Sequence, residues 1–183
     1  MTTFQKQRTF SVKNLTITAV FTAIFCVVSP LSIPIGAVPI SLSSLAIFLA
    51  CAVLGGVKST VAVTVYVLIG LTGLPVYSSF TGGIAVLLGV TGGFIIGYIP
   101  CAFITGALLT TFNDKKALYP LAFIVGTLIL YCFGVGFYML AYKVTFSVAF
   151  ITCVVPFIIV DVIKIILATM LTIIIKQKLK HIK

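Results

Sequence analysis

The chain has 183 residues, of which 61% are hydrophobic and 8% charged, and its formal net charge is +10. A soluble domain needs many more charged side chains on its surface, so this composition excludes a soluble globular protein and indicates an integral membrane protein. The basic residues are spread over loops and ends, which does not favour a nucleic-acid-binding protein. The five cysteines are scattered without metal-ligand spacing, so we interpret them as packing residues and expect no metal site.

The stretches without charge predict six transmembrane helices in a single domain over residues 1–183, because a helix that crosses the bilayer needs about 20 mainly apolar residues. In chain order, the helices are expected over Leu15–Val28, Leu42–Leu54, Lys58–Ile69, Thr91–Phe112, Leu118–Tyr142 and Phe150–Lys176. The first helix is expected to be retained rather than cleaved as a signal peptide, because no convincing small-residue cleavage site follows it.

The basic residues also predict the orientation of these helices. All but Lys143 and Lys164 fall on loops and ends that alternate onto one side. The positive-inside rule places that side in the cytoplasm. We therefore expect a multi-pass protein of the cell membrane, surrounded by lipid, with a cytoplasmic N-terminal segment (1–13) and a basic cytoplasmic tail (177–183).

Two segments on the outer side are rich in turn-forming residues. Leu31–Ser41 contains two prolines and a glycine, and Thr72–Val90 is a long glycine-rich loop with one short helical turn expected near Ile84–Leu88. This loop is too apolar for disorder, and irregular backbone at membrane depth is tolerated where it is buried in protein or lines a cavity. We predict that it folds over a pocket near the extracellular side. Thr91, which follows the loop, is a predicted N-cap.

Two further features predict how the later helices are built. Gly89, Gly93 and Gly97 are spaced by four residues, which is typical of close helix packing in membranes. Pro156 lies early in the sixth predicted helix, so that helix either starts afresh there or bends.

Two charges lie inside the sixth predicted helix. Asp161 is one of only two acidic residues in the chain, and Lys164 follows three residues later, so both project from one helix face. A lone charge at mid-membrane costs about 2.5–3.5 kcal/mol, so such residues face a partner, a cavity or a ligand. The pair is either an ion pair that only joins helices or a ligand site. As a site, an acceptor beside a donor suits a neutral group with both N–H and C=O, or a zwitterion.

The sequence contains no enzymatic motif. It has no P-loop, no HExxH and no GxSxG pattern, and Asp114 is expected in a cytoplasmic loop, far from Asp161. We therefore predict a protein that is not an enzyme, holds no cofactor and has no energy source of its own.

Three segments carry a resemblance to a known family. They are VPISLSS at 38–44, GLPVYSSFTGGIAVLLGVTGG at 73–93 and PFIIVDVIKIILA at 156–168. The chain resembles the BioY family, the biotin-specific S-components of energy-coupling factor (ECF) transporters. The resemblance implies the S-component fold, an all-α integral membrane protein of six helices that captures biotin from outside. It also implies partners, namely a transmembrane coupling protein and a pair of ATP-binding-cassette ATPases that use the ATP.

The resemblance also implies site residues. Substrate contacts are expected from Asp161, Lys164, Ser41, Ser43, Tyr77, Ser79, Phe80 and Thr91. The chain departs from the family pattern at Ser41, at Ser43 and at the pair Ser78–Ser79, where serine offers a hydroxyl group but a shorter reach. Ala19 and Ala23 match the small-residue motif by which S-components dock on the coupling protein.

Three other interpretations predict different behaviour. An ion- or proton-coupled secondary transporter or channel would use Asp161 as the titrating group. An S-component for another vitamin would keep the same architecture. A structural assembly subunit would bind no small molecule at all.

Overall fold

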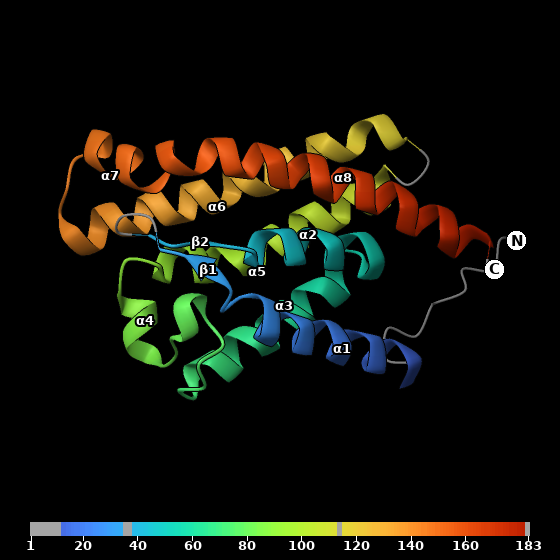
Figure 1. Ribbon diagram of the computed structural model, residues 1–183, viewed down its shortest axis with the longest axis horizontal. Coiled ribbons are helices and arrows are strands. Elements are labelled where there is room, and N and C mark those ends of the chain that lie inside the picture. Colours follow the sequence, from blue (N-terminus) through green and yellow to red (C-terminus); the bar gives the residue numbers. More distant parts are fainter. Residues whose placement is uncertain (1–11, 35–37, 113–114, 182–183) are drawn as a thin grey trace, which may run out of the picture.

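The computed structural model describes residues 12–34, 38–112 and 115–181, and it is built mainly of helices (Figure 1). Most of the predicted N-terminal segment, together with Asp114 and Lys183, lies outside these residues. The elements in chain order are α1 (Val12–Val28), β1 (Ser32–Ile33), β2 (Ile40–Ser41), α2 (Ser43–Leu54), α3 (Gly56–Leu71), η1 (Ser78–Phe80), α4 (Ile84–Leu88), α5 (Gly92–Thr111), η2 (Lys116–Leu118), α6 (Tyr119–Tyr142), α7 (Phe146–Cys153), η3 (Val155–Phe157) and α8 (Ile158–His181).

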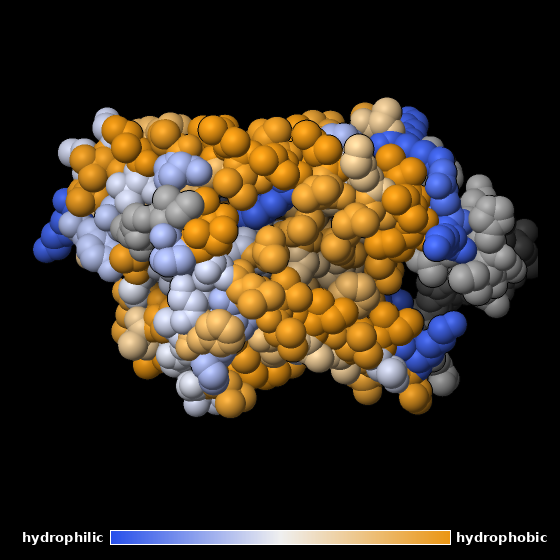
Figure 2. All heavy atoms as spheres, viewed as in Figure 1, coloured by the Kyte–Doolittle hydropathy of each residue, from blue (hydrophilic) through white to orange (hydrophobic). Residues whose placement is uncertain are grey.

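The helices lie where the charge-free stretches predict them. Three segments are long and apolar enough to cross a membrane, namely 92–111, 116–142 and 146–178, and α1, α2 and α3 are shorter apolar helices. Apolar side chains cover most of the face seen in Figure 2, and hydrophilic side chains gather toward its two ends. The start of α1 and the end of α8 lie at the same end of the molecule (Figure 1). The predicted class, a helical membrane protein, is confirmed.

The turn between α2 and α3 depends on a glycine. Gly55 has φ +75°, a left-handed conformation that side chains other than hydrogen disfavour, and its N–H donates to Cys51 O at 3.0 Å. Just beyond it, α3 approaches α5 so closely that a Cβ atom on Gly106 would lie 2.6 Å from Gly56 Cα. Aromatic rings fill the neighbouring core, where the Phe48 and Phe123 centroids are 5.0 Å apart.

Glycines also bring α5 and α6 together. A Cβ atom on Gly93 would lie 2.5 Å from Phe133 O, and one on Gly97 would lie 2.9 Å from Phe133 Cβ. The predicted close packing therefore holds for these two residues. Gly89 does not belong to the row, because it ends α4 in an extended conformation before α5 begins. The spacing of four residues is helical only where the helix is continuous.

The described residues of the two outer segments include short regular elements. The segment after α1 forms a short antiparallel hairpin, in which Ser32 pairs with Ser41 and Ile33 with Ile40. The sequence analysis did not predict this hairpin, because strands of two residues are too short to show an alternating pattern. The long loop contains α4 where the helical turn was expected.

Pro156 starts a new helix rather than bending an old one. Of the two outcomes expected within Phe150–Lys176, a bend or a fresh start, the structure has the fresh start: α7 ends at Cys153, η3 contains the proline, and α8 begins at Ile158. Proline lacks the N–H that an interior helical position needs, whereas the first turn tolerates it. As a result, Asp161 lies in the first turn of α8.

Candidate ligand-binding site

A cavity opens where the hairpin and the long loop meet four helices, α2, α5, α6 and α8. Its wall combines aromatic and aliphatic side chains with a few polar groups, a composition typical of small-molecule sites. It is lined by Val38, Pro39, Ser41, Ser44, Ser78, Thr91, Phe94, Ile95, Tyr98, Thr127, Leu130, Tyr131, Phe157, Asp161 and Lys164.

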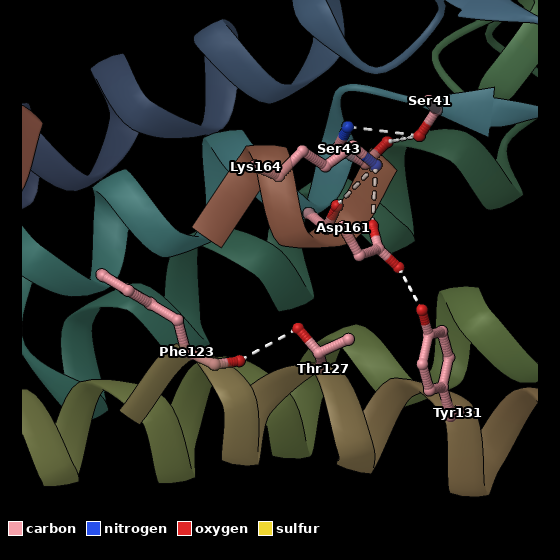
Figure 3. A network of polar contacts seen from close by, with 8 residues as sticks. Ser41, Ser43, Phe123, Thr127, Tyr131, Asp161 and Lys164 are labelled. Atoms are coloured by element: carbon pink, nitrogen blue, oxygen red, sulfur yellow. Dashed lines mark hydrogen bonds and ion pairs between the residues drawn. The ribbon is translucent and has the colours of Figure 1, made fainter. Parts of the chain in front are cut away.

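The polar centre of this cavity is a chain of four side chains. Lys164 Nζ lies 3.2 Å from Asp161 Oδ1 and donates to Ser44 Oγ at 3.1 Å. The Tyr131 hydroxyl donates to Asp161 Oδ2 at 2.6 Å. Figure 3 shows Asp161 between Lys164 and Tyr131, so that donors from α8 and α6 converge on its carboxylate, while Ser44 on α2 accepts from Lys164. The side chains of Lys164 and Asp161 are 7% and 14% exposed, so both charges are withdrawn from the surface.

The position of Asp161 suits a negative charge. The first turn of a helix carries unpaired N–H groups and the positive end of the helix dipole, which stabilise an anion. Lys164, one turn later on the same face, neutralises the carboxylate. The restart of the helix at Ile158 therefore places the carboxylate at a helix start, where the helix itself helps to stabilise its charge.

The pair retains capacity for a ligand. An ammonium has three N–H donors, and two partners of Lys164 are found among the described residues. Each carboxylate oxygen has two lone pairs. Among the described residues, one donor contacts each Asp161 oxygen: Lys164 contacts Oδ1 and Tyr131 contacts Oδ2. The cluster can therefore donate to one ligand oxygen and accept from ligand N–H groups at the same time. Among the described residues, no group of three or more His, Cys, Asp or Glu side chains is placed to hold a metal ion.

Of the other predicted contacts, Ser41 and Thr91 line the cavity and Ser43 lies directly behind Ser41. The Ser41 hydroxyl donates to Ser43 Oγ at 2.7 Å (Figure 3). Thr91 occupies the N-cap position of α5, as predicted, but its side chain makes no capping hydrogen bond.

Tyr77, Ser79 and Phe80 do not line the cavity. Tyr77 is 1% exposed and donates to Val67 O at 2.7 Å, which ties the loop to α3. Burial raises the pKa of the Tyr77 phenol to about 12, so the hydroxyl remains a donor at neutral pH. Ser79 faces the hairpin, where its N–H donates to Ser32 Oγ at 2.8 Å. Phe80 is 66% exposed.

The backbone explains this arrangement. Ser79 and Phe80 both have a positive φ, 58° and 57°. Such a conformation costs about 1–2 kcal/mol for a residue with a side chain, so surrounding contacts must hold it in place. The consecutive left-handed residues turn the loop tip, and Ser78, just before them, is the loop residue that lines the cavity. The sequence did not reveal this turn, because such conformations are usually marked by glycine or asparagine.

Several lining residues were missed by the sequence analysis. On α6 these are Thr127, Leu130 and Tyr131, whose spacing of three and four residues places them on one helix face. Two polar side chains four residues apart in an otherwise apolar helix were the available signal. On α2, Ser44 follows the serines that were singled out.

The predicted docking residues lie away from this cavity. Ala19 and Ala23 are exposed on α1 and line an apolar groove that continues over α3 and the start of the long loop. The other residues of the groove are Leu15, Thr18, Thr22, Cys26, Val27, Val61, Val65, Ile69, Leu74 and Val76.

Comparisons with known proteins agree with this architecture. The model of the BioY family matches residues 3–181. The biotin transporter BioY of Thermotoga maritima is 38% identical over 161 residues, which cover 86% of this chain and 92% of the relative. The biotin transporter BioY2 of Lactococcus lactis subsp. cremoris is 35% identical over 168 residues, 92% of each chain. The crystal structure of the S-component for biotin from an ECF-type ABC transporter superposes with a TM-score of 0.83 at 29% identity, covering 98% of this chain and 95% of that one.

The apolar helices, the cavity and the structural match define the class, a helical membrane protein with the S-component fold. Within that class, the chain belongs to the BioY family. The resemblance drawn from the three sequence segments is therefore confirmed.

Proposed function

We propose that this protein is the membrane subunit that captures biotin from the outside of the cell for import. Its relatives are biotin transporters, and the similar solved structure is an S-component for biotin. The single observation that carries the proposal for this chain is the Asp161–Lys164 pair, which lies in the cavity with both acceptor and donor capacity. The relatives do not favour a proton-coupled transporter, a different vitamin or an assembly subunit.

Biotin offers complementary groups. Its ureido ring has two N–H donors beside one carbonyl oxygen. In our proposal Asp161 accepts from the N–H groups, and the remaining N–H of Lys164 donates to the ligand oxygen. Charged partners make such hydrogen bonds about twice as strong as neutral ones. Phe94, Ile95 and Phe157 provide apolar surface for the fused rings and the alkyl chain.

The smaller polar side chains complete the site in this proposal. Ser41 and Thr91 contact the ligand, and Ser43 supports Ser41 through their hydrogen bond. Ser78 takes the contact that the sequence had assigned to Ser79. Tyr77, Ser79 and Phe80 shape the loop rather than touch the ligand, since their side chains point to α3, to the hairpin and to the surface.

Import needs partners, because the chain carries no ATP-binding motif. We propose that a transmembrane coupling protein binds at the α1–α3 groove, and that a pair of ABC-type ATPases drives the cycle through it. Ala19 and Ala23 are exposed and one helical turn apart, which allows a helix of the partner to approach closely.

The proposed location is the cell membrane, with several crossings and both termini in the cytoplasm. The start of α1 and the end of α8 lie at one end of the molecule (Figure 1). Lys13 and Lys178 lie near those two ends. The cavity would then open toward the other, extracellular side.

The decisive experiment is a titration of the purified protein with biotin and a panel of other vitamins, including thiamine, riboflavin and folate. Saturable binding of biotin alone is the expected result. Selective binding of another vitamin would replace biotin in the proposal, and absence of saturable binding to every compound would overturn it.

A further inference from the structure

We infer that Tyr131 is a positioning residue for ligand capture: it fixes the Asp161 carboxylate so that its free lone pairs face the ligand. The inference rests on the proposed function and adds a residue that neither the sequence motifs nor the charged pair identify. It starts from the 2.6 Å hydrogen bond between the Tyr131 hydroxyl and Asp161 Oδ2.

The two oxygens of Asp161 are held from two different helices. Lys164, on the same helix, holds Oδ1, whereas Tyr131 reaches Oδ2 from α6, thirty residues away in sequence. With Lys164 alone, the carboxylate still turns about its last side-chain bond, a torsion with a broad energy profile. The second donor removes this freedom, because a rotated carboxylate breaks both contacts. A preformed acceptor avoids the entropy cost of ordering the side chain during binding.

Tyr131 is itself well placed to act as a fixed point. Its side chain is half-buried and lines the cavity beside Leu130. The helix that carries it is pressed against α5, where a Cβ atom on Gly93 would collide with Phe133 O and one on Gly134 would lie 2.4 Å from the Phe94 ring. Because this contact leaves little room for α6 to shift, the position of α5 defines where the hydroxyl lies.

Conservative replacement of Tyr131 separates this role from a packing role. Tyr131→Phe removes the hydroxyl and keeps the ring. The matched control is Tyr138→Phe on the same helix, since Tyr138 stacks on Tyr142 with ring centroids 4.8 Å apart and does not line the cavity. We expect Tyr131→Phe to weaken biotin binding about tenfold and to leave the ligand-free melting temperature within a few degrees of wild type. Tyr138→Phe should bind like wild type.

A double-mutant cycle tests whether Tyr131 acts through Asp161. Titrations with biotin up to millimolar concentration compare Tyr131→Phe in the wild-type and Asp161→Asn backgrounds. The loss should shrink from about tenfold to threefold or less, since the charge-assisted bond is already gone. An equal loss in both backgrounds would show direct ligand contact and overturn the inference.

The outcome for the wild type keeps the two proposals apart. If wild-type protein binds biotin and Tyr131→Phe binds it equally well, the role of Tyr131 is refuted and the proposed function stands. If wild-type protein does not bind biotin, the proposed function fails, and this inference fails with it.

Discussion

Tyr66 on α3 and Tyr77 in the long loop each donate a hydrogen bond to the backbone carbonyl of the residue beside the other tyrosine. The Tyr66 hydroxyl donates to Val76 O at 3.1 Å, and the Tyr77 hydroxyl donates to Val67 O at 2.7 Å. Their rings meet edge to face with centroids 5.8 Å apart. Each tyrosine thus binds the backbone next to the other, and the loop that contributes Ser78 to the cavity is fastened to α3.

Removal of one of these hydroxyls should loosen the loop. Tyr77→Phe leaves Val67 O without its side-chain donor, and loss of a buried hydrogen bond costs about 1–3 kcal/mol. We expect a lower free energy of unfolding and faster hydrogen exchange over residues 72–83, measured in the same detergent as wild type. Thr81→Val is the control, because the hydrogen bond found for the Thr81 hydroxyl among the described residues stays within the exposed loop tip, to Ser78 O. Equal exchange in Tyr77→Phe and wild type would refute the fastening role.

The same phenol predicts a dependence on pH. The pKa of Tyr77 is raised from an ordinary value of 10 to about 12 by burial, so the fold favours the neutral form. The unfolded chain loses this proton first as the pH rises, and the contribution of Tyr77 to stability is therefore complete below pH 10 and lost between about pH 10 and 12. Thermal unfolding between pH 8 and 11 should show a steeper decline for wild type than for Tyr77→Phe. Parallel declines would contradict the prediction.

The charged pair predicts a large loss of affinity when either member is neutralised. Asp161→Asn and Lys164→Ala each remove one of the proposed charge-assisted contacts to the ligand and leave the other charge buried and unpaired. We expect biotin binding to weaken by well over tenfold, at least about 1.4 kcal/mol. Thr169→Val is the control and should bind normally, because the Thr169 hydroxyl bonds Ile165 O on the same helix and is absent from the described lining of the cavity. Unchanged affinity for biotin in both charge variants would refute the proposal that biotin binds at this pair.

The pair was readable from the sequence because charges inside an apolar stretch have few explanations. Tyr131 was not, because tyrosine is common toward the ends of membrane helices and its partner is thirty residues distant. The positions of the six apolar helices followed from the charged loops. The sequence left open whether the helix bends or restarts at Pro156, and the separate 3-10 turn η3, which contains the proline between α7 and α8, shows a restart.

The loop shows a second limit of sequence reasoning. Tyr77, Ser79 and Phe80 were assigned to the ligand because the loop as a whole was expected to cover it. The direction of each side chain depends on the left-handed conformation of Ser79 and Phe80. The sequence gives no sign of this conformation, because neither residue is a glycine. A loop can therefore be placed correctly over a cavity while its individual contacts are not, because one turn reverses which residues point inward.

The docking proposal predicts that substitutions in the α1–α3 groove reduce biotin uptake without reducing biotin binding. Ala19→Leu or Ala23→Leu places bulk in the exposed groove, which blocks close approach of a partner helix but does not reach the cavity. Purified variants should bind biotin normally, whereas uptake into cells that express the coupling protein and ATPases should fall at least tenfold. Val20→Leu, on the same helix but outside the groove, should transport normally. Normal uptake by both alanine variants would exclude this surface as the dock.

The contact between α5 and α6 predicts opposite effects for two glycine substitutions. A Cβ atom on Gly93 would lie 2.5 Å from both Phe133 O and Phe137 Cβ, so Gly93→Ala must push the helices apart. Overpacking of this kind costs about 1–3 kcal/mol. A Cβ atom on Gly136 meets nothing within 4 Å, and there alanine should be neutral or stabilise α6 by up to about 1 kcal/mol through its higher helix propensity.

The substitution at Gly93 should also affect biotin binding. Gly93 precedes Phe94 and Ile95, which line the cavity, and it packs against the helix that carries Tyr131. We expect Gly93→Ala to lower the melting temperature and to weaken biotin binding, since a displaced α6 withdraws the Tyr131 hydroxyl from Asp161. Gly136→Ala should alter neither property for the worse. Thermal unfolding and biotin titration of the two variants side by side provide the measurement. If Gly93→Ala is destabilised but binds biotin with unchanged affinity, the α5–α6 contact maintains the fold without setting the geometry of the site.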